Sequence, residues 1–192
     1  SKGKKREADL SMYTWVDNPE DLASLEDIDA VVELMGGHEG TPYNLVKAAL
    51  QNKKHVITAN KALLAHHGYE LATLAEKNNV NLMYEAAVAG CIPVIKALRE
   101  GLAANRFTGL YGILNGTCNF ILTQMRETGR NFTDILKDAQ AKGYAEADPS
   151  FDVDGIDTAH KLCILTALAF GVKPDIKNMT KTGISHLTAT DI

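Results

Sequence analysis

Strand-like and helix-like segments alternate along the first half of the chain, and this alternation restricts the possible folds more than any other feature. Short apolar runs at residues 29–34, 55–58 and 81–86 are typical of buried strands. The stretches between them, residues 41–52 and 62–78, have the length and pattern of helices. Strands separated by such helices imply a parallel sheet. The sequence therefore predicts an α/β protein with a doubly wound, Rossmann-like parallel sheet.

The pattern changes after Gly90, where helical segments predominate. The predicted elements are helices at residues 93–104, 119–127, 133–141 and 155–170, a strand at residues 107–114 and an acidic loop at residues 142–154. We place a domain boundary between residues 86 and 87. Residues 1–86 are then the C-terminal half of the doubly wound sheet, and residues 87–192 form a separate α+β domain.

Composition excludes several classes of protein. The net charge is −4, and no basic stripe with interleaved aromatic residues is present, so nucleic acid is not an expected partner. No apolar run approaches the ~18 residues of a membrane span, and no secretory signal follows Ser1. The three cysteines, Cys91, Cys118 and Cys163, form no C-x-x-C pair, which favours reduced thiols in a cytoplasmic protein.

One motif of dinucleotide-binding folds is absent from the 192 residues. Such folds begin with a strand and a G-x-G-x-x-G loop that seats the pyrophosphate at a helix N-terminus. The glycine-rich stretch at residues 36–40 has a different spacing and is typical of a tight turn. We therefore expect the chain to be part of a longer protein and to be inactive by itself.

An acidic segment at residues 143–161 carries most of the chemical information. Five carboxylates (Glu146, Asp148, Asp152, Asp154 and Asp157) precede Lys161. A calcium loop of the EF-hand type would need a bidentate carboxylate at its twelfth position, where the best alignment places this lysine. The calcium interpretation therefore fails.

Asp157 and Lys161 are four residues apart, so on a helix they share a face. This spacing fits a solvated ion pair, or a lysine that points from an apolar helix into an acidic cleft and donates a proton to a carbonyl oxygen. The carboxylates of Glu146 and Asp152 suit the α-ammonium group of an amino-acid substrate.

Three further segments combine polar or backbone groups at the ends of predicted elements. Asn60 and Lys61 follow a parallel strand, at the edge where open α/β sheets bind ligands. Residues 85–93 form a small-residue turn that either packs closely or directs several carbonyls to one point. The turn at Asn115-Gly116-Thr117 either binds a polar ligand or caps the helix that follows.

Together these segments resemble the homoserine dehydrogenase family, from about Val31 to the C-terminus. The resemblance rests on residues 32–37, 58–61, 85–93 and 115–117, and above all on residues 143–149 with Asp157 and Lys161. It implies NAD(P)-dependent, reversible reduction of L-aspartate 4-semialdehyde to L-homoserine, a step towards threonine, methionine and isoleucine. It also implies a homodimer formed through the catalytic domain.

The resemblance implies a role for each candidate residue. Lys161 and Asp157 would be catalytic, and Glu146, Asp152, Asn115, Gly116 and Thr117 would bind the substrate. Lys61 and Asn60 would lie at the cofactor, and the carbonyls of Glu85, Val88, Gly90 and Ile92 would bind sodium or potassium. Cys118 and Cys91 depart from the family pattern, which has a hydroxyl residue and glycine at these positions.

The alternative function is a non-catalytic amino-acid-binding or regulatory module that has lost the cofactor site. The Glu146, Asp157 and Lys161 set favours the enzyme, whereas the missing glycine loop favours the module. The choice between NAD and NADP is not readable, because the residue at the ribose 2′ position falls at or before Ser1. Lys4, Lys5 and Arg6 would either approach a 2′-phosphate or form a solvated terminus.

Overall fold

The computed structural model describes residues 8–192, so Lys4, Lys5 and Arg6 lie outside the described residues. The chain divides into two compact units, Ser1–Ala87 and Val88–Ile192. Within the described residues, no helix has the length and apolar character needed to cross a membrane.

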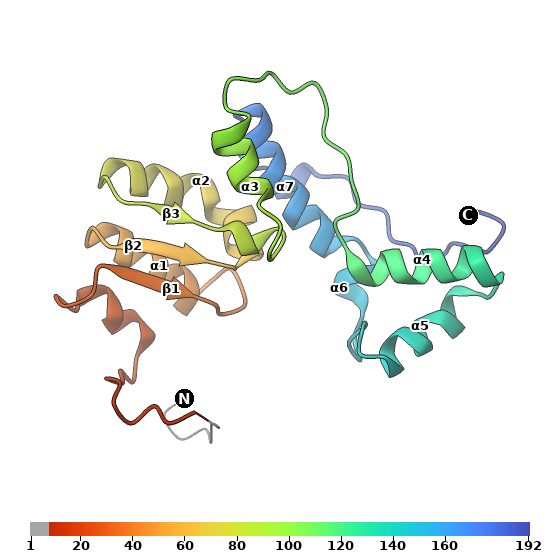
Figure 1. Cartoon of the computed structure of the whole chain (residues 1–192), viewed down its shortest axis with the longest axis horizontal. Coiled ribbons are helices and arrows are strands. Elements are labelled where there is room, and N and C mark those ends of the chain that lie inside the picture. The colour runs from red at the N-terminus through yellow and green to blue at the C-terminus, as the bar shows by residue number, and fades with distance from the viewer. Residues whose placement is uncertain (1–7) are drawn as a thin grey trace. The chain divides into compact units, whose positions relative to one another are not determined.

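The first unit contains the predicted parallel sheet. Strands β1 (Ala30–Glu33), β2 (His55–Thr58) and β3 (Leu82–Met83) pair in parallel in the order β1-β2-β3 (Figure 1). Helix α1 (Thr41–Gln51) connects β1 to β2, and α2 (Lys61–Lys77) connects β2 to β3. The α/β prediction is confirmed. The third strand is shorter than predicted, because the chain continues into a 3-10 helix, η2 (Glu85–Ala87). A second 3-10 helix, η1 (Pro19–Ser24), precedes β1.

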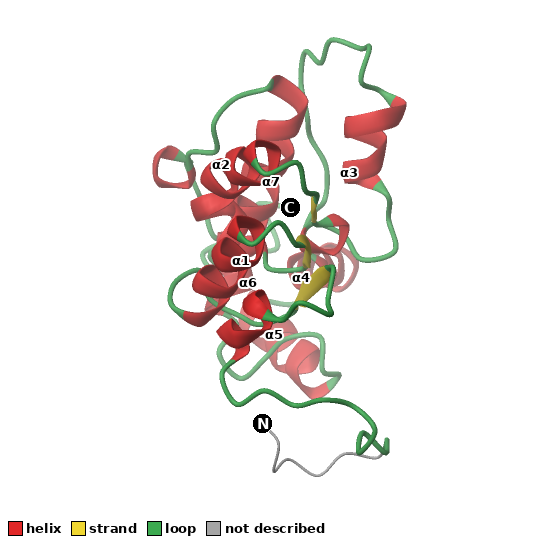
Figure 2. Cartoon of the chain, turned by 90° about the vertical axis from the view of Figure 1, so that its left-hand side faces the viewer, coloured by secondary structure: helices red, strands yellow, loops and turns green. Residues whose placement is uncertain are grey.

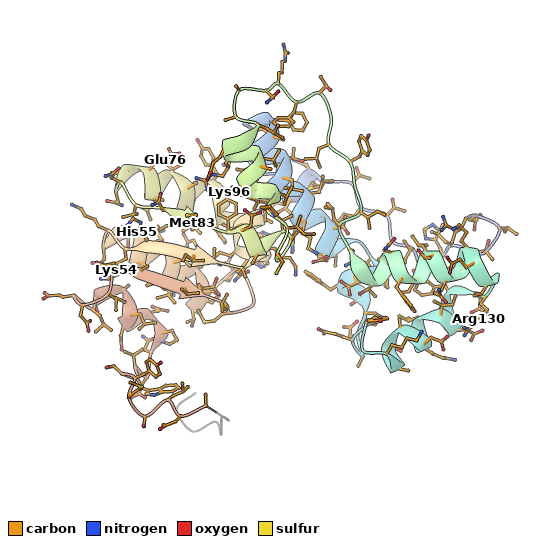
Figure 3. All side chains as sticks on the ribbon, viewed as in Figure 1. Lys54, His55, Glu76, Met83, Lys96 and Arg130 are labelled. Carbon is orange, nitrogen blue, oxygen red and sulfur yellow. The ribbon has the colours of Figure 1, made fainter. Side chains whose placement is uncertain are left out.

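The two faces of this sheet have different surroundings. Val31, Val56 and Leu82 lie in one row across the strands and are buried on the face that α1 contacts. The neighbouring row of Val32, Ile57 and Met83 is 58%, 47% and 49% exposed; Met83 is labelled in Figure 3. Alternation along each strand thus separates a packed face from an open one.

The second unit consists of helices joined by loops, and no strand occurs in residues 88–192 (Figure 2). Its elements are α3 (Val94–Lys96), a π-helix η3 (Ala97–Gly101), α4 (Gly116–Thr128), α5 (Phe132–Ala141), α6 (Ser150–Val153), α7 (Ile156–Phe170) and a 3-10 helix η4 (Ile176–Asn178). Its core is formed by Ile121 and Met125 of α4, Ile135 and Ala139 of α5, and Val153 of α6. Arg130, after α4, pairs with Asp138 of α5 at 2.6 Å (Figure 3).

The predicted strand at residues 107–114 is wrong. The segment is an irregular connection in which Tyr111 is 98% and Ile113 76% exposed. A strand needs a hydrogen-bonded partner, and residues 88–192 contain none. The helix predicted at residues 93–104 is also shorter and ends at Gly101.

The acidic segment was predicted to be a loop over residues 142–154, but its last part forms the short helix α6. The turn between α6 and α7 orients this segment. Gly155 is the N-cap of α7 and has a φ of 78°, a conformation that glycine adopts at little cost. Ile184 N donates to the Val153 carbonyl at 2.9 Å. A Cβ atom at Gly183 would lie only 2.9 Å from that carbonyl, so only glycine permits this close approach. The C-terminal segment therefore holds α6 in place.

Candidate active site

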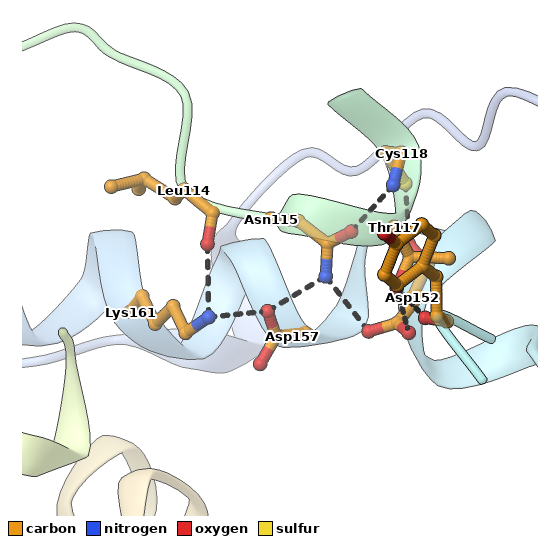
Figure 4. A network of polar contacts seen from close by, with 8 residues as sticks. Leu114, Asn115, Thr117, Cys118, Asp152, Asp157 and Lys161 are labelled. Atoms are coloured by element: carbon orange, nitrogen blue, oxygen red, sulfur yellow. Dashed lines mark hydrogen bonds and ion pairs between the residues drawn. The ribbon is translucent and has the colours of Figure 1, made fainter. Parts of the chain in front are cut away.

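A polar cluster in the second unit joins Asn115, Asp152, Asp157 and Lys161 (Figure 4). Asn115 is the N-cap of α4, Asp152 belongs to α6, and the other two residues occupy the first turns of α7. Contacts of α4 with α6 and of α6 with α7 bring these distant positions together.

Asn115 is the centre of this cluster. Its Nδ2 donates to Asp152 Oδ1 at 2.7 Å and to Asp157 Oδ2 at 2.9 Å, while its Oδ1 accepts from Cys118 N at 2.8 Å. A side-chain amide has two hydrogens, and both point at carboxylates here. The side chain therefore caps α4 and holds two acids at the same time.

Asp152 is held by the start of α4. Its Oδ2 lies 2.9 Å from Thr117 Oγ1, and this hydroxyl also lies 2.8 Å from the Tyr144 carbonyl, so its single hydrogen is shared. The Cys118 thiol donates to the Asp152 carbonyl at 3.3 Å. The first turn of α4 thus fixes both the side chain and the backbone of this acid.

Lys161 points into the cluster rather than into solvent. Its Nζ donates to Asp157 Oδ2 at 2.7 Å and to the Leu114 carbonyl at 2.9 Å. The lysine side chain is 18% exposed and that of Asp157 4%. These two bonds use two of the three ammonium hydrogens, which leaves one to donate to a ligand.

The charges of the cluster suit a ligand that carries both a carbonyl oxygen and an ammonium group. Two carboxylates and one ammonium give the cluster one net negative charge, which favours a bound cation. The remaining hydrogen of Lys161 can donate to an oxygen on which negative charge develops.

Glu146 lies outside this cluster. It is exposed, and Gln140 Nε2 donates to its backbone carbonyl at 3.0 Å. Within the described residues, no hydrogen bond or ion pair joins its carboxylate to Lys161 or Asp157. Gly116 is the first residue of α4 and offers only backbone groups.

In the first unit, Asn60 and Lys61 lie at the start of α2. Asn60 is the N-cap: its Oδ1 accepts from Leu63 N at 3.0 Å, and its Nδ2 donates to the Gly37 carbonyl at 2.7 Å. Lys61 is the first helical residue and directly follows the carboxyl end of β2. Sequence and structure thus both put these two residues at the edge where ligands of parallel sheets bind.

The four residues of the predicted cation site lie along the turn at residues 85–92. Glu85 begins η2, Val88 is buried, and Ile92 is 62% exposed. The Ile92 carbonyl accepts from Val94 N at 2.8 Å, which leaves it a second lone pair.

Two members of the site were not predicted. The Leu114 carbonyl is a backbone group whose direction depends on the exposed segment before α4, and no sequence signal marks it. Cys118 was noted only as a departure from the family pattern. The one available signal was the asparagine three residues earlier, since asparagine is a common N-cap whose side chain accepts from the backbone N–H at this spacing.

Comparison with known families assigns both parts of the chain. A model described as homoserine dehydrogenase matches residues 93–192, more than half of the chain, and one described as homoserine dehydrogenase, NAD binding domain, matches residues 1–85. The chain belongs to the homoserine dehydrogenase family. The recognition made from the sequence is thereby confirmed.

Individual homoserine dehydrogenases are similar over most of this chain. Those of Neisseria gonorrhoeae and Pseudomonas aeruginosa are 54% and 56% identical, covering 93% and 90% of this chain but 41% and 39% of their own lengths. A crystal structure from Thiobacillus denitrificans has a TM-score of 0.87 at 54% identity and covers 91% of this chain and 40% of that one. A hyperthermophilic archaeal mutant in complex with NADPH has a TM-score of 0.82 at 30% identity, covering 93% and 54%. The chain spans about two fifths of the length of the curated relatives.

Cys118 gives this member of the homoserine dehydrogenase family a testable property. Burial, together with the charges of Asp152 and Asp157, raises the pKa of its thiol to about 11. The thiolate is the reactive form, so the thiol stays protonated and unreactive at neutral pH. We expect iodoacetamide at pH 8 to alkylate the exposed Cys91 and to spare Cys118, as measured by peptide mass spectrometry. Equal rates at the two cysteines in the folded protein would contradict this, and denaturation in urea should make the rates converge.

Proposed function

We propose that the protein is a homoserine dehydrogenase that reversibly reduces L-aspartate 4-semialdehyde to L-homoserine with NADPH or NADH. The observation that carries the proposal is the buried cluster in which Lys161 is held by Asp157 beside Asn115 and Asp152. An ammonium held in this way is suited to proton transfer to a substrate oxygen. We also propose a cytoplasmic location and a homodimer formed through residues 87–192, on the family resemblance.

Lys161 acts as the proton donor in this proposal. When bound, a reduced nicotinamide cofactor would supply the hydride that reduces the aldehyde carbon, and negative charge would then develop on the carbonyl oxygen. The ammonium of Lys161 donates a proton to that oxygen, which becomes the hydroxyl of homoserine, and in the reverse direction the amine takes the proton back. Asp157 and the Leu114 carbonyl orient the ammonium for this transfer.

The acidic residues bind the substrate's own ammonium group. Asp152, fixed by Asn115 and Thr117, supplies a preoriented carboxylate. Glu146, an exposed residue of the same acidic segment, supplies a second carboxylate when substrate is present. Gly116 and Thr117 contribute polar groups of the first turn of α4. Because both amide hydrogens of Asn115 are used by carboxylates, this residue orients the acids more than it contacts the substrate.

The first unit has features that fit a dinucleotide. Strands β1 and β2 end side by side, and Asn60 and Lys61 follow the second of them. Added Cβ atoms at Gly36 and Gly37 would meet no atom within 4 Å, so space is open beside the loop after β1. We propose that these loops contact the cofactor. The carbonyls of Glu85, Val88, Gly90 and Ile92 remain our proposal for a sodium or potassium site.

The proposal is tested by assay of a polypeptide of full family length that contains this chain. We expect oxidation of NADPH or NADH that depends on aspartate 4-semialdehyde, followed at 340 nm. The 192-residue chain alone is expected to show no such activity, because it contains no G-x-G-x-x-G loop to seat the pyrophosphate. A full-length protein that consumes neither cofactor with this substrate would refute the proposed function.

Replacement of Glu146 by leucine separates substrate binding from chemistry. Its carboxylate is exposed and lies outside the Lys161 cluster, so its loss should weaken binding of ground state and transition state alike. We expect KM for aspartate semialdehyde to rise about tenfold with kcat changed less than about threefold. Glu127→Leu, another exposed acid of the same unit, is the matched control and should leave both constants unchanged. A large fall in kcat in Glu146→Leu would instead place this residue at the reacting atoms.

A further inference from the structure

The carboxyl ends of β1 and β2 carry a buried polar pair that the proposed chemistry does not use. Glu33 and Thr58 are register partners on the packed face of the sheet, and each is only 1% exposed. Thr58 Oγ1 donates to Glu33 Oε2 at 2.6 Å. A carboxylate this deeply buried is costly unless donors satisfy it, so its presence needs an explanation.

The pair is connected at both ends to the loop that follows β1. Glu33 Oε1 accepts from Met35 N at 2.5 Å, which shapes the first turn of that loop. Thr58 Oγ1 accepts from Asn60 N at 3.0 Å, and Asn60 Nδ2 donates to the Gly37 carbonyl at 2.7 Å. One continuous chain of hydrogen bonds therefore fixes the loop at Met35 and again at Gly37.

This loop has the properties of a surface that is held open for a ligand. Gly37 has a φ of 87°, and added Cβ atoms at Gly36 and Gly37 would meet nothing within 4 Å. The loop ends at Gly40, the N-cap of α1, and leaves the sheet at the same edge as Asn60. Buried side chains thus fix the backbone of this loop by hydrogen bonds, while the space beside Gly36 and Gly37 is open.

We propose that Glu33, Thr58 and Asn60 form a clamp that preorganises the loop after β1 for binding of the dinucleotide. Glu33 and Thr58 are positioning residues: they act through the loop and do not touch the reacting atoms. The proposal rests on the proposed function for the identity of the ligand. It deepens that function by naming the buried side chains that determine cofactor affinity.

The test is direct binding of NADPH and NADH to the full-length protein without substrate, followed by the fluorescence of the reduced nicotinamide. Thr58→Val removes the hydroxyl that joins both halves of the clamp and keeps the side-chain volume. Asn60→Ser keeps a helix-capping oxygen but is too short to reach the Gly37 carbonyl. We expect both variants to raise Kd for the preferred cofactor about tenfold, or ~1.4 kcal/mol. Thr58→Val, whose side chain acts only through the loop, should leave kcat at saturating cofactor nearly unchanged.

Two control variants separate positioning from general destabilisation. Thr58→Ser keeps the hydroxyl and should restore the wild-type Kd. Val56→Ala removes buried volume from the same strand, so it should lower the unfolding midpoint without changing Kd. An unchanged Kd in Thr58→Val, or an equal increase in Val56→Ala, would overturn the clamp. Wild-type protein that binds NADPH but reduces no semialdehyde would overturn the proposed function alone, and one that binds neither cofactor would overturn both.

Discussion

Replacement of Lys161 by alanine is expected to lower kcat by about 10²–10⁴-fold, the usual contribution of a positioned general acid. KM for aspartate semialdehyde should change far less, because the lost proton transfer stabilises mainly the transition state. The expected size of the effect follows from the geometry: the ammonium is fixed by Asp157 and the Leu114 carbonyl and keeps one hydrogen to donate. Steady-state kinetics on the full-length protein measure both constants.

Chemical rescue provides the matching control for this variant. The truncated side chain leaves a space beside Asp157, and a small amine such as ethylamine can enter it. We expect added ethylamine to restore part of the lost kcat, with a dependence on pH that follows the amine's own protonation. Lys137→Ala, which alters a lysine of α5 outside the cluster, should leave kcat unchanged. Wild-type kcat in Lys161→Ala would refute the assignment.

Replacement of Asp157 by alanine is expected to reduce stability as well as activity. This carboxylate is 4% exposed and accepts from both Lys161 and Asn115. Removal of one partner of a buried ion pair typically costs ~3–5 kcal/mol, because the other charge stays behind. Lys161 is 18% exposed and keeps its bond to the Leu114 carbonyl. We therefore expect the free energy of unfolding to fall by ~3 kcal/mol, the lower end of that range.

Urea unfolding of the full-length protein measures this loss as a fall in the transition midpoint. Asp148→Ala is the matched control, since that aspartate is exposed and, within residues 8–192, its carboxylate accepts hydrogen bonds from Ser150 alone. Its effect on the free energy of unfolding should stay within ~0.5 kcal/mol. An Asp157→Ala variant as stable as Asp148→Ala would show that the buried pair contributes little. Asp157→Asn keeps the size of the side chain and one acceptor oxygen, so its stability should lie between those of Asp157→Ala and Asp148→Ala.

The sequence by itself determined the features that depend on local geometry. Alternating strands and helices predicted the parallel sheet, because residues pack with a period of two in strands and 3.6 in helices. The four-residue spacing of Asp157 and Lys161 predicted that they would share a helix face, and they form an ion pair at 2.7 Å. In these cases the contact lies within one element, so its spacing is readable from the chain.

The remaining features were decided by packing between distant elements. Asn115 contacts two acids that lie 37 and 42 residues further along the chain, and the Leu114 carbonyl reaches Lys161 over 47 residues. The predicted strand at residues 107–114 failed for the same reason, since a strand exists only with a partner, and residues 88–192 supply none. Local pattern determines which elements form and which residues share a face. Only the tertiary structure determines which faces meet, because that depends on the packing of whole helices against one another.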